Sequence, residues 1–231
     1  MHTEFWNRFE ERVAPFALLQ HPFYQAWSKG ELTREDLRAY AAEYWHHVSA
    51  FPACLSALHC RLPDGALRRE VLRNLAEEEG IDTANGRAHS DLWMDFAVGM
   101  GATRTAVEEH GLQPETTALL ATFRELMQEP APAAAMAALY AYESKVPEIA
   151  RTKAEGLARH YGTTGSGARY FTLHQTADVY HAQVWRDLID LQLAANPDVA
   201  ETALDAAERA ANALWAALDG IERERMKMYA N

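Results

Sequence analysis

The balance between alanine and the aliphatic β-branched residues constrains this chain of 231 residues more than any motif does. Alanine occurs 43 times, whereas isoleucine and valine together occur only 13 times. Alanine has the highest intrinsic helix propensity, and strands favour β-branched side chains. The sequence therefore predicts an all-α protein.

Apolar residues recur at helical spacing along most of the chain. The clearest stretch follows Thr33, which forms a shortened capping box with Asp36 and precedes apolar residues at helical spacing as far as Val48. Glycine, proline and asparagine separate the remaining stretches. We predict a compact bundle of about seven or eight helices in a single domain, 1–231, with further helices near residues 5–20, 66–79, 88–100, 115–128, 132–160, 169–194 and 199–226.

Charge and hydropathy exclude several classes of partner. The chain has 33 acidic and 22 basic residues and a formal net charge of -11, so its field repels polyanions and we expect no nucleic acid partner. The opening residues 1–13 carry scattered charges and have no apolar core of a signal peptide. The longest weakly polar stretch, 131–142, is shorter than the roughly 20 apolar residues that cross a bilayer. We expect a cytoplasmic protein without a membrane segment.

One stretch carries three metal-ligating side chains at helical spacing. His174, Asp178 and His181 stand at i, i+4 and i+7, so on one helix they share a face roughly 60° wide. Two imidazoles and a carboxylate are a preferred donor set for iron, manganese or zinc. An ordinary polar stripe is the alternative interpretation, and the spacing alone does not exclude it.

A second candidate ligand is Glu143, which lies in an apolar segment. A buried and unpaired carboxylate there would be costly, and a cation would remove that cost. Pro147 has no N–H to donate to the carbonyl of Glu143, so we expect the helix to kink or bulge at this point. An exposed glutamate beside a structural proline is the alternative.

The third segment contains Glu78 and His89. Along an unbroken helix these residues would lie about 16 Å apart, too far for one small metal cluster. Gly80 and the pair Asn85 and Gly86 predict a break that folds them together. A solvated acidic face is the alternative, because Glu78 is one of three consecutive glutamates.

A rival ligand pair competes with Glu78 and His89. Glu43 and His46 have the Glu-x-x-His spacing of ferritin-like di-metal bundles, and Asp178 and His181 have the same spacing with aspartate. Spacing arithmetic does not choose between the two pairs.

Several stretches are ordinary packing signatures singly but specific in combination. They are His21–Thr33, Phe51–Pro52, Asn74–Leu75, Leu92–Trp93, Ala138–Ser144 and the run from His174 to His181. Together they resemble the haem-oxygenase-like di-metal oxidase family that includes the Chlamydia protein associating with death domains and is related to the PqqC and TenA proteins. The resemblance covers residues from about 18 to 195.

The resemblance implies a haem-oxygenase-like bundle with two transition-metal ions, Fe/Fe or Fe/Mn, buried between helices. This sequence has about four extra residues between the first glutamate and its histidine, so Glu79 and Asp82 are alternatives to Glu78. Glu43 and His46 then have structural roles. The implied ligands are Glu78, His89, Glu143, His174, Asp178 and His181.

The resemblance also implies an activity, namely formation of para-aminobenzoate for folate biosynthesis from the enzyme's own side chains. Tyr24 would supply the ring and Lys153 the amino nitrogen, while Tyr40 and Tyr142 match further family tyrosines that relay electrons. Dioxygen and an electron donor would be co-substrates, and the family implies a homodimer. Three alternatives stay open: a di-metal oxidase acting on an external fatty acid or amino acid, a thiaminase-like hydrolase using Cys54 or Cys60, and a non-enzymatic interaction protein.

Overall fold

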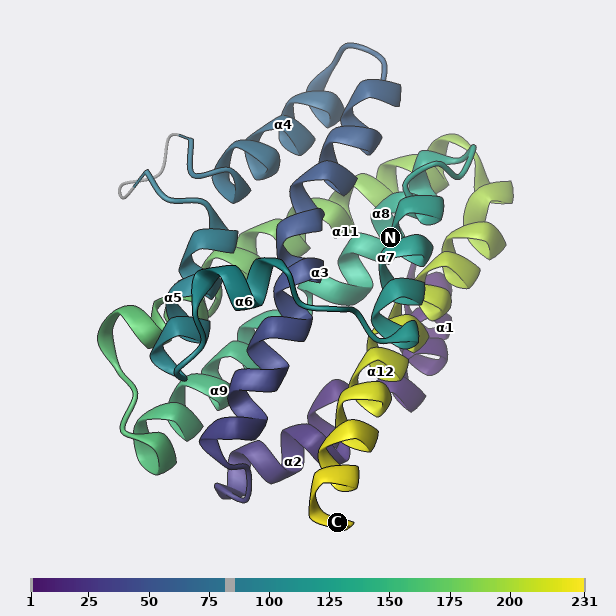
Figure 1. The fold of residues 1–231 in the computed structure, drawn as a ribbon. Coiled ribbons are helices and arrows are strands. Elements are labelled where there is room, and N and C mark those ends of the chain that lie inside the picture. Colours follow the sequence, from purple (N-terminus) through teal and green to yellow (C-terminus); the bar gives the residue numbers. More distant parts are fainter. Residues whose placement is uncertain (1, 82–85, 231) are drawn as a thin grey trace.

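The computed structural model describes residues 2–81 and 86–230, and these residues fold into helices without any strand (Figure 1). The all-α prediction is thus confirmed. The described helices are α1 (Thr3–Val13), α2 (Pro22–Lys29), α3 (Arg34–Arg61), α4 (Ala66–Glu78), α5 (His89–Gly99), α6 (Arg104–Glu108), α7 (Pro114–Leu126), α8 (Pro132–Glu143), α9 (Val146–Tyr161), α10 (Arg169–His174), α11 (Ala177–Ala195) and α12 (Ala200–Ala230), with 3-10 turns η1 (Ala14–Phe16), η2 (Leu18–Gln20), η3 (Gly165–Ala168) and η4 (Pro197–Val199).

These helices outnumber the seven or eight predicted from periodicity, because breaks divide two of the predicted stretches and because α2 and α6 lie outside all of them. Residues 132–160 separate into α8 and α9, since Pro147 falls in the first turn of α9, where its missing N–H is tolerated. The helix ends at Glu143 instead of kinking there. Residues 169–194 separate into α10 and α11 at residues 175–176.

Helix α3 crosses the middle of the bundle and begins where the capping box predicted (Figure 1). The backbone N–H of Asp36 donates to Thr33 Oγ1 at 3.1 Å, and the N–H of Thr33 donates to Asp36 Oδ2 at 2.7 Å. These reciprocal bonds satisfy two N–H groups that the first helical turn leaves without intrahelical partners. The cap fixes the start of the helix that carries Tyr40 and Tyr44.

The buried side chains form two clusters with different compositions. In the first, α12 packs against the alanine-rich α8, whose residues 133–138 are at most 1% exposed, and the small side chains allow close helix approach. The second cluster is aromatic and includes Trp27, Tyr40, Trp93 and Phe171. Tyr142 packs against both clusters, so the end of α8 lies at their junction.

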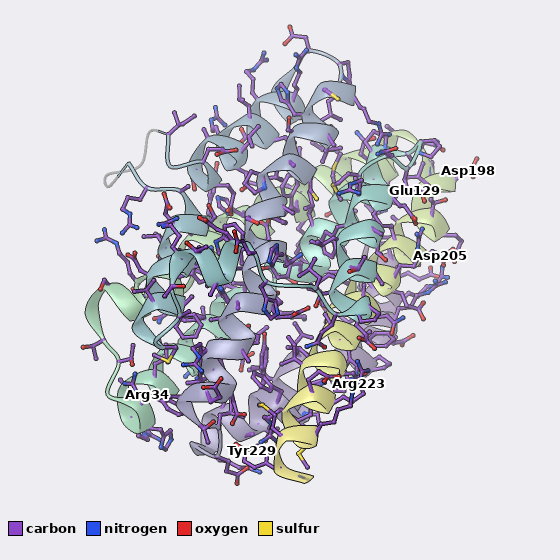
Figure 2. The ribbon with its side chains drawn as sticks, in the orientation of Figure 1. Arg34, Glu129, Asp198, Asp205, Arg223 and Tyr229 are labelled. Carbon is purple, nitrogen blue, oxygen red and sulfur yellow. The ribbon has the colours of Figure 1, made fainter. Side chains whose placement is uncertain are left out.

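Polar contacts on the surface attach α12 to its neighbours. Arg223 pairs with Glu115 of α7 at 2.6 Å, and the hydroxyl of Tyr229 donates to Asp36 Oδ2 at 2.8 Å (Figure 2). Exposed pairs of this kind contribute about 1 kcal/mol or less, so the packed core dominates the stability.

Within residues 2–81 and 86–230, no helix combines the length and the hydropathy that crossing a bilayer requires.

Candidate metal centre and tyrosine cavity

Six buried carboxylate and imidazole side chains converge in two groups of three. Within each group, one ligand atom from every residue lies within 4.8 Å of the other two. Five of the helices contribute to them: α4, α5, α8, α10 and α11. The first group is Glu78, His89 and His174, and the second is Glu143, Asp178 and His181.

The first group depends on the turn that follows α4. Gly80 adopts a φ of +73°, and a Cβ there would lie 2.3 Å from the carbonyl carbon of Arg87, so the returning chain passes against a residue without a side chain. The predicted break is present, and it brings the Glu78 carboxylate within 2.9 Å of His89 Nδ1. His174 Nδ1 donates to the carbonyl of Tyr170 at 2.7 Å, which leaves Nε2 as the ring nitrogen that could bind a metal ion.

The second group depends on the break between α10 and α11. The prediction that His174, Asp178 and His181 share one helix face is wrong in this respect, because the break assigns His174 to the first group. His181 Nδ1 lies 3.3 Å from Asp178 Oδ1 and 3.8 Å from Glu143 Oε2. His181 Nε2 donates to Glu77 at 2.9 Å, an orientation by a carboxylate that is typical of metal-binding histidines.

Two further side chains hold Glu143 in place. The indole N–H of Trp185 donates to Glu143 Oε2 at 2.8 Å, and the side-chain amide of Asn74 donates to Glu143 Oε1 at 3.3 Å. Both donors are uncharged, so they orient the carboxylate without neutralising it.

The six side chains of the two groups are called the ligand cluster, and their electrostatics suit the binding of metal ions. Burial, together with the nearby Asp178 and Glu78, raises the pKa of Glu143 to about 8. Burial opposes protonation of His181, but Asp178, Glu143 and Glu77 outweigh it and raise its pKa to about 10. His89 Nδ1 is buried and makes no hydrogen bond of good geometry. A donor set of three imidazoles and three carboxylates with such an orphaned nitrogen suits two transition-metal ions.

Three of the alternative ligands, Glu79, Glu43 and His46, lie outside the two groups of three. Glu79 is exposed, and Asp82 lies outside the described residues. Glu43 instead accepts hydrogen bonds from His110 Nε2 at 2.7 Å and from the backbone N–H of Gln113 at 3.0 Å, before the first turn of α7. His46 belongs to neither group of three among the described residues.

Lys153 lies in a separate cavity with aromatic walls. Its amine Nζ donates to the hydroxyls of Tyr24 and Tyr40, each at 2.7 Å, and lies 4.1 Å from the centre of the Tyr24 ring. Burial lowers the pKa of Lys153 well below its ordinary value and raises the pKa of Tyr24 well above its own. Burial therefore disfavours the charged form of both groups.

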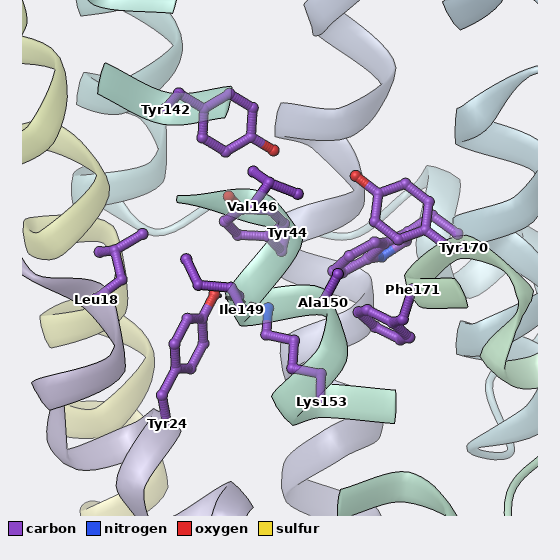
Figure 3. Close-up of a pocket in the computed structure, with 11 residues that line it drawn as sticks. Leu18, Tyr24, Tyr44, Tyr142, Val146, Ile149, Ala150, Lys153, Tyr170 and Phe171 are labelled. Atoms are coloured by element: carbon purple, nitrogen blue, oxygen red, sulfur yellow. Dashed lines mark hydrogen bonds between the residues drawn. The ribbon is translucent and has the colours of Figure 1, made fainter. Parts of the chain in front are cut away.

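Tyr142 and Tyr170 form the wall between this cavity and the ligand cluster. Both residues line the Tyr24 cavity, and both line a smaller cavity beside Glu78 and His174. Their hydroxyls point toward one another (Figure 3). The tyrosine cavity and the cluster are thus neighbours separated by two phenol side chains.

Sequence reasoning missed four residues of this site, namely Glu77, Asn74 as a ligand partner, Tyr44 and Tyr170. Tyr170 carries a usable signal, because it stands four residues before His174 and thus on the same helix face. Glu77 has no such signal, since any of the three consecutive glutamates satisfies the local pattern.

An all-helical bundle that buries two carboxylate–imidazole groups defines a metal-dependent oxidoreductase with a haem-oxygenase-like fold. A family model described as an iron-containing redox enzyme matches residues 38–215, and this chain belongs to that family. The 4-aminobenzoate synthase of Nitrosomonas europaea is 42% identical over 229 residues, covering 93% of this chain and 91% of the relative. The 4-aminobenzoate synthase of Chlamydia trachomatis is 41% identical, covering 88% and 86%.

Solved structures support the same fold. A TenA homologue from Pseudomonas syringae superposes with a TM-score of 0.80 at 17% identity, covering 95% of this chain and 93% of that one. A CADD-like protein of unknown function from Nostoc punctiforme gives 0.74 at 16% identity, covering 96% and 98%. The resemblance inferred from the sequence is therefore confirmed at the level of family and fold.

Proposed function

We propose that this protein is a self-consuming 4-aminobenzoate synthase that takes the ring from Tyr24 and the nitrogen from Lys153. The observation that carries the proposal is the placement of Lys153 Nζ 2.7 Å from the Tyr24 hydroxyl in a closed cavity beside the ligand cluster. Dioxygen and an electron donor are the proposed co-substrates. The proposed ligands of the two ions, Fe/Fe or Fe/Mn, are Glu78, His89, Glu143, His174, Asp178 and His181.

Bound metal ions would supply the oxidation by dioxygen that cutting a phenol ring from its backbone requires, which acid–base groups do not provide. The protein's own residues supply position and environment. Lys153 meets the hydroxyl end of the Tyr24 ring, which is para to the bond that joins the ring to the main chain. Nitrogen delivered at that end gives the 1,4-substitution of 4-aminobenzoate.

The environment keeps both reacting groups uncharged and in contact. A neutral amine retains the lone pair that a new bond to nitrogen requires, whereas an ammonium does not. Trp27, Tyr40 and Phe171 surround the amine with ring faces and edges, so water has little access. Tethering replaces an encounter in solution with a fixed geometry.

The size of the cavities argues against an external substrate. The cavity at Tyr24 offers about 20 Å³ to the centre of a water-sized molecule, and the one beside the ligand cluster offers about 10 Å³. Each holds about one small molecule such as water or dioxygen, and neither accommodates a fatty acid or an amino acid. A thiaminase-like mechanism is also disfavoured, because burial raises the pKa of Cys54 to about 11 and neither Cys54 nor Cys60 lines either cavity.

The test is to load the anaerobic protein with iron, with and without manganese, and then to admit dioxygen and reductant. Protein carrying ring-labelled tyrosine and 15N-labelled lysine is expected to lose mass and to release arylamine that contains both labels. Tyr24→Phe, which keeps the ring but removes the hydroxyl contact with Lys153, is the matched control and is expected to release none. Unchanged mass without arylamine would reject the proposal.

The homodimer and the cytoplasmic location stay predictions. Size-exclusion chromatography with light scattering checks the former, and cell fractionation checks the latter.

A further inference from the structure

The cavity that holds Tyr24 and Lys153 has one thin wall. On the outer side of that wall lies a larger cavity at the surface, which offers about 350 Å³ to the centre of a water-sized molecule. Leu18 and Ile149 line both cavities, on the same side of the inner cavity as Tyr24 (Figure 3). Two aliphatic side chains thus separate the Tyr24 ring from a space open to solvent.

Leu18 belongs to the short segment 14–20, which connects α1 to α2. None of the residues in this segment is buried. Its hydrogen bonds are few and local, such as those from Gln20 N–H to the Ala17 carbonyl at 2.8 Å and from His21 N–H to the Leu18 carbonyl at 3.0 Å. The remaining lining of the inner cavity comes from helices that are packed on several sides. The 14–20 segment is therefore the part of the enclosure that costs least to displace.

We infer that Leu18 and Ile149 form the exit through which a small aromatic product leaves the Tyr24 cavity. This inference rests on the proposed function, because only a detached ring has to leave. The empty space beside Tyr24 is much smaller than an aromatic ring, so a detached ring stays in the space that Tyr24 occupied until a lining side chain moves aside. The outer cavity is large enough to receive a ring, and Val13, Phe16 and Leu214 give it apolar walls.

The charged residues that line the outer cavity favour release of the product over its retention. Lys145 contributes one positive charge and is paired with Glu10 at 3.0 Å, while Glu148 adds a second negative charge. The rim is therefore net negative, and it repels an aromatic carboxylate that has reached it. A product that passes Leu18 is expected to continue into solvent.

The first experiment uses Tyr24→Ala, which removes the part of the side chain that phenol replaces, and phenol as the probe. Stopped-flow tryptophan fluorescence measures the association and dissociation of phenol. Adding Leu18→Trp is expected to slow both rates at least tenfold and to leave Kd unchanged, whereas Leu18→Ala is expected to accelerate both. Leu191→Trp, the same enlargement at an exposed residue of α11 that lines neither cavity, is the matched control and should leave the rates unchanged.

Equal phenol rates in the Leu18→Trp, Leu18→Ala and Leu191→Trp variants would overturn the assignment of the exit. This readout requires no turnover, so it separates failure of the exit from failure of the proposed function. A second measurement uses the full chain with Tyr24 intact, so it does not depend on the folding of Tyr24→Ala. In the Leu18→Trp variant, acid-quenched samples are expected to contain arylamine. Native ultrafiltration of the same variant is expected to leave that arylamine with the protein. Release at the wild-type rate would contradict the assignment of Leu18 to the exit.

Discussion

The ligand cluster and the Tyr24–Lys153 cavity are equally buried, yet they handle charge in opposite ways. In the cluster, burial disfavours the charged form of Glu78, but His89 and His174 outweigh it and lower the pKa of this carboxyl group. In the cavity, no charged residue within 2–81 and 86–230 offsets burial, which lowers the pKa of Lys153 well below its ordinary value. The comparison shows that contact with imidazoles favours the charged carboxylate of Glu78, whereas burial without an opposite charge disfavours the ammonium form of Lys153.

The largest expected effect comes from removing one ligand of the cluster. His89→Ala should reduce bound metal from two ions per chain to one or none, and arylamine formation should fall at least a hundredfold, because the first group loses an imidazole. Metal analysis of protein loaded anaerobically measures this. His46→Ala, a half-buried histidine outside both groups, is the control and should keep both ions. Equal metal content in the two variants would refute the ligand assignment.

A bound metal ion should also stabilise the native protein, because it binds carboxylates and imidazoles that only folding brings together. With free Mn²⁺ at a hundred times its Kd, we expect the free energy of unfolding to rise by about 2.7 kcal/mol per site. Urea unfolding of anaerobic protein with and without Mn²⁺ measures the increase. In Asp178→Asn the gain should be at least halved, and an equal gain in this variant would show that the ion binds elsewhere.

The neutral amine of Lys153 predicts a pH dependence of stability with a definite sign. Between its lowered native pKa and its ordinary pKa of about 10.5, the unfolded chain binds one more proton than the native protein. The free energy of unfolding therefore rises with pH across that window, by about 1.4 kcal/mol per unit from this group, and falls as the pH is lowered.

Urea unfolding at pH 7, 8 and 9 measures this contribution as the difference between wild type and Lys153→Met, which lacks the titrating amine. Lys145→Met, at an exposed lysine close to the start of the same helix, is the control and should keep the wild-type slope. Parallel curves for all three proteins would indicate that Lys153 is charged in the native state and would remove the contrast between the two regions.

The smallest expected effect tests the wall between the regions. Tyr170→Phe removes the hydroxyl of a buried residue that points toward Tyr142, and it should reduce the free energy of unfolding by about 1 kcal/mol, with both ions retained. Tyr180→Phe, at a residue with an exposed hydroxyl, should change the stability by less than half as much. Loss of metal in Tyr170→Phe would mean that the wall belongs to the ligand cluster itself.

Local sequence patterns predicted much of the fold and part of the site. The alanine content indicated helices, the capping box located the start of α3, and Gly80 indicated the break that folds His89 back toward Glu78. The same local patterns did not predict that residues 175–176 interrupt the helix, because neither glycine nor proline marks this position. The sequence pattern therefore predicted that His174 shares one helix face with Asp178 and His181.

What the sequence by itself determined is the helical class, most helix boundaries and the residue types from which a metal centre can form. These properties depend on the backbone and on neighbours within about one helical turn, which the sequence specifies directly. Only the tertiary structure brought Glu78 rather than Glu43 into the ligand cluster. It also oriented His181 with Glu77. Finally, it placed Lys153 against Tyr24, which lies 129 residues away in the sequence. Contacts at such separations depend on how whole helices pack, and no local pattern encodes that packing.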